Sequence, residues 1–474
     1  MFQNKRYTDD IFDISPEYGF LPKYTPNNEL PEIFDCLVEV SNSTPIYIDY
    51  KSGKKGLLSK RGALKKVIEK LPNFVDEIDT TNKKHIQTLY RIYSFLASSY
   101  LLEPSYHTYL ETGEYGKAET HLPENLAQPL VKTANALKIF PWLDYHYSYC
   151  LCNTFIKDKT KPATWDNMDL VTKFSGTPDE QGFISIHVDI NQNSPNLIKS
   201  VFTMLEGLKK ENMTELYNGL KLNLDTMTLN NERRRNIYKA SNPNNYNELR
   251  MFIMGIKGNE EIFGDGVVYE GVQEFEGKPV KFRGQTGAQD DIIPTEDIIT
   301  GLINFYPENE LTKYLFELRE YRPKIVQEFM MDLRESFKDF FDKLKTLCTK
   351  SKEHDSLVIL LLILEQIYKF RNGHWMMVQQ YILKQTKYSK ATGGTPITTW
   401  LPNQIQACLD YTEVVLQNID KNVVKQETLK TEYLRVLQDV IKYRGILNKQ
   451  KEELCKEGFN PDKVYEANES EKEY

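Results

Sequence analysis

Cysteine and histidine are scarce in this sequence. Its 474 residues contain 6 cysteines and 7 histidines, and no two cysteines have the CxxC spacing of a zinc site or a redox motif. Only Cys150 and Cys152 stand close together, with one leucine between them. This usage argues against a zinc domain and against a disulfide framework, so we interpret the cysteines as reduced thiols.

The sequence also lacks a long apolar run, the pattern of a signal peptide at its start and an excess of basic charge. Its longest apolar run, LVILLLIL at 357–364, is far shorter than the ~20 residues that cross a bilayer. The start of the chain, MFQNKRYTDDIF, has no continuous apolar core of a signal peptide. Acidic and basic residues are interspersed and leave a net charge of -7, which offers no footprint for DNA or RNA. We therefore expect a cytoplasmic protein that binds neither membranes nor nucleic acid.

Helical periodicity is the main pattern that the sequence contains. Apolar residues recur at helical spacing from 60 to 155, from 182 to 240 and from 296 to 383, whereas no alternating run is long enough for a substantial sheet. We predict a mainly α protein, and a chain of this length favours more than one domain. The predicted parts are a small N-terminal helical domain at 1–160, a larger helical domain at 161–402 and a helical C-terminal extension with a polar tail at 403–474.

Three segments interrupt the helical pattern. The segment EPSYHTYLETGEYGKAETHLPENLAQ, at 103–128, is predicted to be a long loop, and the segment 256–296 contains seven glycines and few periodic apolar residues. A third break, KYSKATGGTPITTWLP, covers 387–402. Long loops inside a compact domain are often functional. Asp290 and Asp291 have no neighbouring metal-ligand set, so we interpret them as solvated loop carboxylates.

One histidine lies in an unusual setting, KFRNGHWMMVQQYIL at 369–383. On a helix, His374 shares a face with Phe370, Met377 and Tyr381, which puts an imidazole into an apolar wall. A haem needs such a surface on its proximal side, with a neutral nitrogen ligand for the iron. Arg371, three residues earlier, can reach along this face towards a haem propionate. A hydrogen-bonded core histidine is the competing interpretation of the pattern alone.

Nine segments, in order from about 15 to 400, resemble the indoleamine 2,3-dioxygenase family of haem enzymes. They are ISPEYGFLP, FPWLDYHYSYCLCNTF, TWDNMDL, QGFISIHVDI, NELRMFIMGIKGN, GDGVVYEG, KFRGQTGAQDD, RNGHWMMVQQYIL and KATGGT. The resemblance implies a two-domain helical protein with haem b. It also implies an enzyme that uses dioxygen to open the indole pyrrole ring of L-tryptophan, giving N-formylkynurenine, which would place it in tryptophan catabolism and the kynurenine pathway.

The resemblance also assigns residues around the cofactor. His374 matches the family's proximal iron ligand, and Arg371 matches its propionate-binding arginine. Thr286 takes the place of a family serine close to the haem. These assignments rest on the matched motifs RNGHWMMVQQYIL and KFRGQTGAQDD.

Further assignments concern the substrate. Phe183 matches the aromatic residue that stacks on the indole, Tyr246 a nearby aromatic pocket position, and Arg250 the arginine that holds the amino-acid carboxylate. An arginine suits this role because its planar fork donates two parallel hydrogen bonds to a carboxylate. Thr392 matches a threonine of a mobile loop, and the glycines at 393 and 394 are expected to let that loop close over the substrate.

The pocket of this chain departs from the family pattern towards polarity. His187 lies where typical members have a serine, and the related tryptophan dioxygenases use a distal histidine to accept a hydrogen bond from the indole N–H. A core histidine bonded to a carbonyl is the competing interpretation of His187. His146 and Asn245 replace residues that are less polar in the family. Buried polar groups select for substrates that carry their partners, so a modified tryptophan is a second candidate substrate.

Three functional hypotheses follow. The first is dioxygenation of L-tryptophan with His187, Phe183 and Arg250 at the reacting centre. A second is a related haem-dependent monooxygenase or rearranging enzyme that acts on a tryptophan derivative, and a third is a haem sensor without turnover. The C-terminal helices are expected to pack on the domain or on a second subunit, so a homo-oligomer is one expectation.

Overall fold

The computed structural model describes residues 5–307, 310–385, 390, 392, 394 and 397–457, with the side chains at 310, 311 and 397–400 excepted. Helices make up most of this part of the chain, and its strands form only three two-stranded pairs. The prediction of a mainly α protein is confirmed. Within the same part, no helix is both long and apolar enough to cross a membrane.

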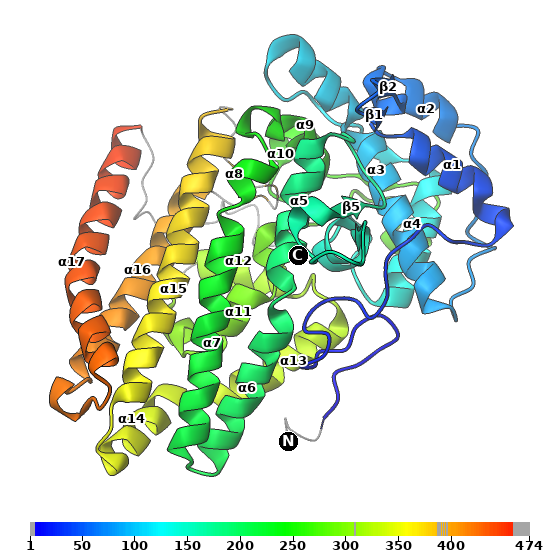
Figure 1. The fold of residues 1–474 in the computed structure, drawn as a ribbon. Helices are drawn as coiled ribbons and strands as arrows, with labels where there is room; N and C mark the ends of the chain where they lie inside the picture. The colour runs from blue at the N-terminus through cyan, green and yellow to red at the C-terminus, as the bar shows by residue number, and fades with distance from the viewer. Residues whose placement is uncertain are drawn as a thin grey trace.

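The long helix α3 (Lys83–Thr112) organises one side of the molecule (Figure 1). Around it lie α1 (Asp35–Ser43), α2 (Ala63–Ile68), α4 (Glu124–Leu137) and the antiparallel pair of β1 (Tyr47–Asp49) and β2 (Lys54–Lys55). Helix α3 continues through Pro104 and α4 begins at Glu124, so the loop predicted at 103–128 is wrong over its first ten and its last five residues. Tyr106 and His107 are buried on this last part of α3, and their burial offsets the backbone hydrogen bond that the proline removes.

Helix α5 (Pro178–Asn191) follows the antiparallel pair of β4 (Thr154–Ile156) and β5 (Met168–Leu170). Its start is encoded locally, because Thr177 Oγ1 accepts a hydrogen bond from the backbone N–H of Glu180 at 3.2 Å and Pro178 occupies the first helical position. The Glu180 carboxylate in turn accepts from the backbone N–H groups of 174, 175 and 176. These bonds fix the rotation of α5 about its axis.

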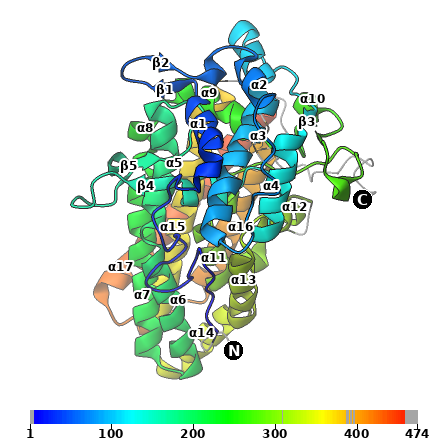
Figure 2. The same ribbon diagram turned by 90° about the vertical axis from the view of Figure 1, so that its right-hand side faces the viewer.

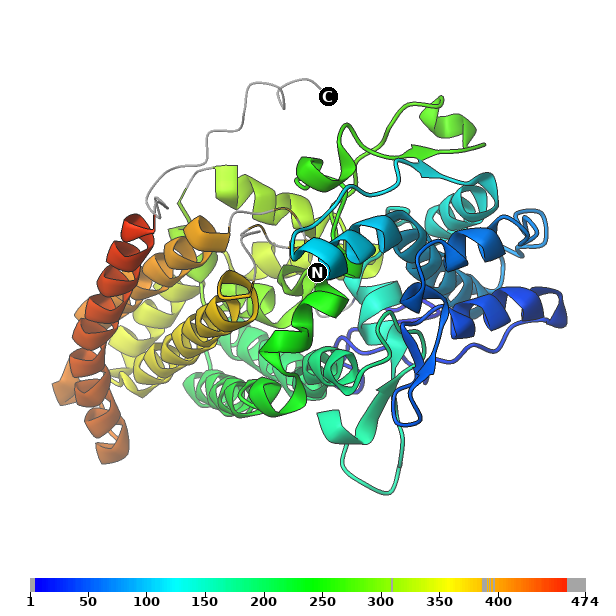
Figure 3. The ribbon, with the colours of Figure 1, turned by 90° about the horizontal axis from the view of Figure 1, so that it is seen from above.

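Long helices form the opposite side of the molecule (Figures 1 and 3). They are α6 (Ser194–Lys209), α7 (Met213–Arg234), α15 (Asp355–Val378), α16 (Ile397–Gln417) and α17 (Glu427–Lys456). The apolar run 357–364 lies in α15 and is buried along its whole length, as the sequence predicts. A π-helical turn, Gln379–Leu383, directly follows α15.

The remaining helices are shorter. They are α8 (Ile237–Ala240), α9 (Tyr246–Arg250), α10 (Glu260–Phe263), α11 (Ile292–Ile299), α12 (Glu310–Arg319), α13 (Lys324–Phe337) and α14 (Phe340–Ser351). In Figure 2 the side that carries α3 and α4 faces the viewer. A parallel pair of β3 (His121–Leu122) and β6 (Val268–Tyr269) ties this side to the glycine-rich segment 256–296. Buried apolar residues from Tyr7 to Leu454 form one continuous cluster, and the domain boundaries at 160 and 402 stay a prediction.

Candidate active site

A cavity lies where α5, α11, α15 and α16 meet the segment 287–290. It contains ≈ 1200 Å³ of space that protein atoms do not fill, part of it open to solvent. Much of its wall is apolar, with the side chains of Ile186, Ile190, Ile237, Ile293, Phe370 and Met377.

His374 lies in this wall, on α15 and one turn after Phe370. Burial, with the positive charge of Arg234 and the neighbouring His187, lowers the pKa of His374 to about 4. The imidazole is therefore neutral at pH 7, and within the described chain it makes no hydrogen bond. A neutral imidazole with a lone pair facing an apolar cavity fits the chemistry of a proximal haem ligand.

His187 lines the same cavity from α5. Burial lowers its pKa, although the nearby Asp290 carboxylate acts in the opposite direction. Phe183, one turn earlier on α5, packs against the imidazole with a distance of 5.6 Å between ring centroids. The hydroxyl of Tyr145 lies 3.4 Å from His187 Nδ1. The carbonyl-bonded core histidine is therefore not what the structure contains, since the ring meets the cavity and a tyrosine.

Arg371 also lines the cavity, but it is already paired. Its Nη2 donates to both carboxylate oxygens of Asp297, at 2.8 and 2.7 Å, and Nη1 donates to the carbonyl of Gln404 at 3.1 Å. Tyr306 contacts both members of the pair. Asp297 lies on α11 and faces the same cavity. A haem propionate at this place would thus share the Arg371 guanidinium with Asp297.

Arg319, at the end of α12, is a second cation of the cavity wall that the sequence did not reveal. Burial, together with the nearby Arg322, lowers the pKa of Arg319 to about 10. Its guanidinium stacks on the ring of Phe316 at 4.5 Å and makes no hydrogen bond to any described residue. The half-buried guanidinium faces the cavity without a direct ion pair to a described residue, although the charge of Asp297 acts on it, so this arginine fits a second propionate.

Arg234, near the His374 end of the cavity, depends on a glycine. A Cβ at Gly373 of α15 would lie 2.1 Å from Nη2 of Arg234, so only glycine leaves room for this guanidinium. The guanidinium also lies over the ring of Phe370, at 5.6 Å. This packing places a fixed positive charge beside the residue before His374. No local signal in the sequence linked positions 234 and 373.

Three residues assigned to the substrate lie where α5 contacts α9: Phe183 on α5, and Tyr246 and Arg250 on α9. Phe183 and Tyr246 are buried, with 4.8 Å between their ring centroids. Arg250 is fully buried, and it donates from Nη1 to the hydroxyl of Tyr115 at 2.9 Å and from Nη2 to the carbonyl of Lys390. None of these three predicted residues is among the described residues that line the cavity. A substrate carboxylate could reach Arg250 only if the Lys390 carbonyl moved away.

The two predicted threonines lie on segments next to the cavity. Thr286 Oγ1 accepts from the backbone N–H of Ala288 at 3.4 Å, and it caps the turn Gly287–Gln289, whose first two residues line the cavity. Thr392 donates from Oγ1 to the carbonyl of Gln285 at 2.7 Å, and its own carbonyl accepts from the N–H of Gly255 at 2.8 Å. The 392 position is thus tied to two other segments, while Gly393 lies outside the described residues.

The interpretation of Asp290 and Asp291 as solvated carboxylates is wrong. Asp291 is buried, with Oδ2 2.7 Å from His146 Nε2 and Oδ1 2.5 Å from Arg322 Nε. Asp290 accepts a hydrogen bond from the hydroxyl of Tyr145 at 2.8 Å. Sequence reasoning missed these partners because they lie 31 to 145 positions away along the chain.

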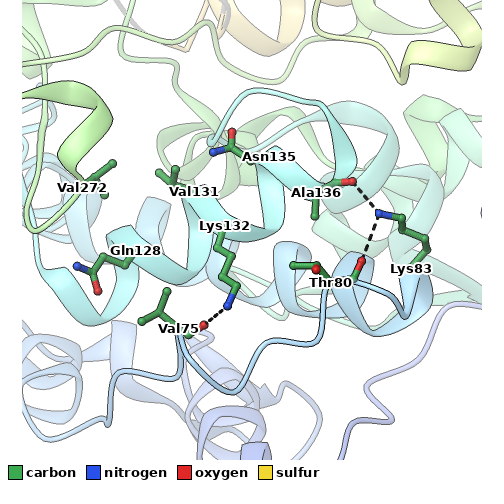
Figure 4. A pocket seen from close by; sticks show the side chains of 9 residues that line it. All are labelled: Val75, Thr80, Lys83, Gln128, Val131, Lys132, Asn135, Ala136 and Val272. Carbon is green, nitrogen blue, oxygen red and sulfur yellow. Dashed lines mark hydrogen bonds between the residues drawn. The ribbon is translucent and has the colours of Figure 1, made fainter.

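Another hollow, of ≈ 1040 Å³, opens on the surface beside α4 (Figure 4). Its two lysines already donate to backbone carbonyls: Lys83 to Ala136 at 3.0 Å and to Thr80 at 3.4 Å, and Lys132 to Val75 at 2.6 Å. No described histidine lines this hollow. It therefore lacks an iron ligand, and the cavity at His374 is the candidate active site.

The sequence is similar to known proteins along most of its length. Residues 8–406 match the family model of indoleamine 2,3-dioxygenase. Indoleamine 2,3-dioxygenase 1 of Rattus norvegicus is 23% identical over 82% of this chain and 92% of its own length. A 6-hydroxytryptophan 2,3-dioxygenase of Fusarium equiseti is 22% identical over 83% of this chain and 89% of its own length. A protein of Haliotis madaka named myoglobin is 22% identical over 57% of this chain and 68% of its own length.

The family model matches well over half of the sequence, and the cavity offers what its cofactor requires: a neutral imidazole, an apolar wall and buried cations. The chain therefore belongs to the indoleamine 2,3-dioxygenase family, and it is a haem b-dependent oxidoreductase, a dioxygenase of the tryptophan-dioxygenase type.

Proposed function

We propose that this enzyme opens the indole pyrrole ring of L-tryptophan with both atoms of dioxygen and releases N-formylkynurenine. The observation that carries the proposal is the pair of neutral histidines, His187 on α5 and His374 on α15, which line one largely apolar cavity. One imidazole can bind iron while the other remains available to the substrate. Haem supplies the site at which dioxygen is activated.

The residues of the chain have the following proposed roles. His374 holds the iron, and Arg371 and Arg319 neutralise the two propionates. Phe183, which packs on His187, and Tyr246 are proposed to hold the flat indole, which reaches them when substrate opens the space beside the cavity, and His187 accepts the hydrogen bond of the indole N–H. Because an enzyme gains most from correct placement of the reacting groups, these contacts provide orientation and exclusion of water.

Arg250 is proposed to bind the substrate carboxylate after a local rearrangement. Its guanidinium is held by Tyr115 and by the Lys390 carbonyl. A carboxylate forms stronger, charge-assisted bonds to a guanidinium than a neutral carbonyl does. Substrate can therefore displace the Lys390 carbonyl, which moves the segment that carries Thr392 and its hydrogen bond to Gln285.

The experiment that tests the reaction is product mass after the reduced, haem-loaded enzyme meets L-tryptophan and ¹⁸O₂. Gain of two labelled oxygen atoms is the expected result, whereas gain of one atom would support a monooxygenase. The same enzyme should then be given equal amounts of L-tryptophan and 6-hydroxy-L-tryptophan, because a relative is named for the hydroxylated substrate. Faster consumption of the hydroxylated compound would replace our substrate assignment.

A second candidate function is oxygen binding without turnover, and the relative named myoglobin motivates it. A stable oxygen complex in the presence of L-tryptophan, with no product by mass, would support this function. The cytoplasmic location and the homo-oligomer through the C-terminal helices are further proposals, drawn from the sequence. Cell fractionation tests the location, and sedimentation of the haem-loaded enzyme tests the oligomeric state.

A further inference from the structure

A chain of hydrogen-bonding groups runs from the cavity into the protein behind His187. Tyr145 belongs to the π-helical turn Tyr145–Tyr149, and its hydroxyl lies 2.8 Å from Asp290 Oδ2 and 3.4 Å from His187 Nδ1. The rings of Tyr145 and His187 meet edge to face, with 5.8 Å between centroids. The tyrosine thus links a carboxylate to one particular nitrogen of the imidazole.

The direction of these hydrogen bonds can be derived from the number of protons. A tyrosine hydroxyl has a single proton, and a carboxylate can only accept. The bond to Asp290 is both shorter and charge-assisted, so it takes the Tyr145 proton. The Tyr145 oxygen can then act towards His187 only as an acceptor. Nδ1 must carry the imidazole proton, and Nε2 is left with a lone pair.

The Asp290 carboxylate cannot easily turn away from this arrangement. Its Oδ2 also accepts from Asn191 Nδ2 at 2.7 Å, and its Oδ1 accepts from the backbone N–H of Ile292 at 2.9 Å. Asn191 is bonded at the same time to the carbonyl of His187, at 2.9 Å. Four hydrogen bonds from three residues, Tyr145, Asn191 and Ile292, therefore fix both the carboxylate and the backbone of the histidine.

Nε2 lies on the far side of the imidazole from Nδ1, and it makes no hydrogen bond to a described residue. His187 itself lines the cavity, close to Gly287, where a Cβ would lie 3.4 Å from the imidazole Cε1. The lone pair on Nε2 is therefore the group with which the imidazole of His187 can bind a ligand. An acceptor of this kind is complementary to an N–H donor and not to an N-alkyl group.

We propose that Tyr145 and Asp290 are positioning residues that hold His187 in its Nδ1–H tautomer, so that Nε2 selects substrates with a free indole N–H. The tautomer follows from the contacts alone, while the choice of ligand rests on the proposed function. The bond at one imidazole nitrogen sets the proton at the other, as in other enzymes that use histidine.

The decisive variant is Asp290→Asn, which is expected to reverse the direction of the hydrogen bonds that link residue 290, Tyr145 and His187. An amide nitrogen in the place of Oδ2 donates to the Tyr145 oxygen, so the hydroxyl proton turns to His187 Nδ1 and the imidazole proton moves to Nε2. Asn191 can accept from the new amide by turning its own, since its Oδ1 has no hydrogen-bond partner in the described chain, and this turn gives up its hydrogen bond to the His187 carbonyl. The amide keeps the size of the carboxylate, so the packing is preserved.

The measurement is ¹⁵N NMR of histidine-labelled enzyme in the haem-loaded ferrous carbon monoxide form, which is diamagnetic. A protonated and an unprotonated imidazole nitrogen differ widely in shift, and the His187 signals are identified by their loss in His187→Gln. The expected result is Nδ1–H in the unmodified enzyme and Nε2–H in Asp290→Asn. An Nε2–H tautomer in the unmodified enzyme, or the same tautomer in both proteins, would overturn the proposal.

Tyr145→Phe gives a second test if Asp290→Asn does not fold. It removes the acceptor at Nδ1, so the single tautomer is expected to become a mixture of both. Tyr149→Phe is the matched control from the same turn, because the buried Tyr149 hydroxyl has no hydrogen-bond partner in the described chain. A mixture in the control as well, or an unchanged tautomer in Tyr145→Phe, would contradict the assigned role.

The selection of substrate is measured as the ratio of kcat/KM for L-tryptophan to kcat/KM for 1-methyl-L-tryptophan. An unpaired buried polar group costs roughly 5- to 150-fold, so the unmodified enzyme should prefer L-tryptophan by such a factor. In Asp290→Asn the ratio should fall towards one, and an unchanged ratio counts against selection by Nε2. If the enzyme does not consume L-tryptophan, the proposed function fails, whereas the NMR result still decides the tautomer.

Discussion

Arg371 and Asp297 form a buried ion pair across the space between α15 and α11, with Nη2 of the arginine 2.8 and 2.7 Å from the two carboxylate oxygens. Each side chain is almost completely shielded from solvent. The aspartate fixes the guanidinium at the cavity wall in the absence of any other anion. It also limits how strongly this guanidinium can attract a propionate, because one negative charge is already present.

Arg371→Met should therefore lower stability as well as haem affinity. The substitution leaves the Asp297 carboxylate buried without its cation, and such a loss typically costs about 3–5 kcal/mol. Urea unfolding followed by circular dichroism gives the free energy of unfolding, and the absorbance of the haem band gives its occupancy. The double variant Arg371→Met/Asp297→Asn removes both charges and should recover most of the stability but not the haem affinity. Equal stability of single and double variants would show that the pair is not coupled.

Arg319→Gln should release haem faster without loss of the fold. The unpaired guanidinium is proposed to bind a propionate, and a hydrogen bond to a charged group is worth about 1.5–3 kcal/mol, which corresponds to roughly 10- to 150-fold in the dissociation rate. Transfer of haem to an excess of apomyoglobin measures that rate. Arg334→Gln is the matched control, since Arg334 also lies over the ring of Phe316, at 5.3 Å, but does not line the cavity. The assignment would be wrong if both variants released haem at the rate of the unmodified enzyme.

His374→Gly should bind haem weakly and lose the spectrum of histidine-ligated iron, because the imidazole is the proposed ligand. Added imidazole can enter the space that the substitution creates and should restore the spectrum in a concentration-dependent way. His187→Gly, with the same loss of an imidazole from the cavity wall, should keep the histidine-ligated spectrum. The reverse outcome, with His187→Gly losing it, would exchange the two roles.

Glu296 predicts a pH dependence of stability. Burial raises its pKa from 4.5 to about 8, partly opposed by the hydrogen bond from Asn223. The folded protein therefore keeps a proton that the unfolded chain loses above pH 4.5, so the free energy of unfolding falls as pH rises, by about 1.4 kcal/mol per pH unit. The loss should end near pH 8, where the folded state also ionises.

Glu296→Gln should remove this dependence, and the measurement is the difference in urea unfolding between variant and unmodified enzyme at pH 5, 6, 7 and 8. The gain in relative stability should grow with pH across this range. Glu320→Gln, at an exposed position, serves as the control and should run parallel to the unmodified enzyme. A difference that stays constant with pH would mean that Glu296 is not the titrating group.

Much of the scaffold could be predicted from the sequence because it depends on local pattern. The apolar run of α15 gave a buried helix, and helical spacing put His374 and Arg371 on one wall, where the structure has them. The loop predicted over 103–128 failed because proline and tyrosine signal a break only where no packing opposes it. In α3 the buried Tyr106 extends the helix past Pro104.

The site was less predictable because it depends on distant contacts. Nothing near position 291 indicates that its carboxylate meets His146 and Arg322, and nothing near 234 indicates that its guanidinium fills the space beside Gly373. Arg250 shows the same limit, since its motif names the residue while its partners, Tyr115 and Lys390, come from other segments. Motifs identify side chains, and tertiary structure decides what those side chains can reach.

Helix α17 lies beyond the part of the sequence that matches the family, yet it holds the helix that carries His374. The Arg435 guanidinium of α17 donates two hydrogen bonds to the Glu365 carboxylate of α15, at 2.7 and 2.8 Å. Tyr443 of α17 stacks on Tyr368 of α15, with 4.2 Å between the ring centroids. Haem binding that stabilises α15 therefore also stabilises the packing of α17 on α15. By thermodynamic linkage, the packing of α17 in turn increases the affinity of the protein for haem. We therefore expect a protease to cleave α17 faster in the haem-free protein than in the haem-loaded protein, so that the rate of cleavage reports the haem content.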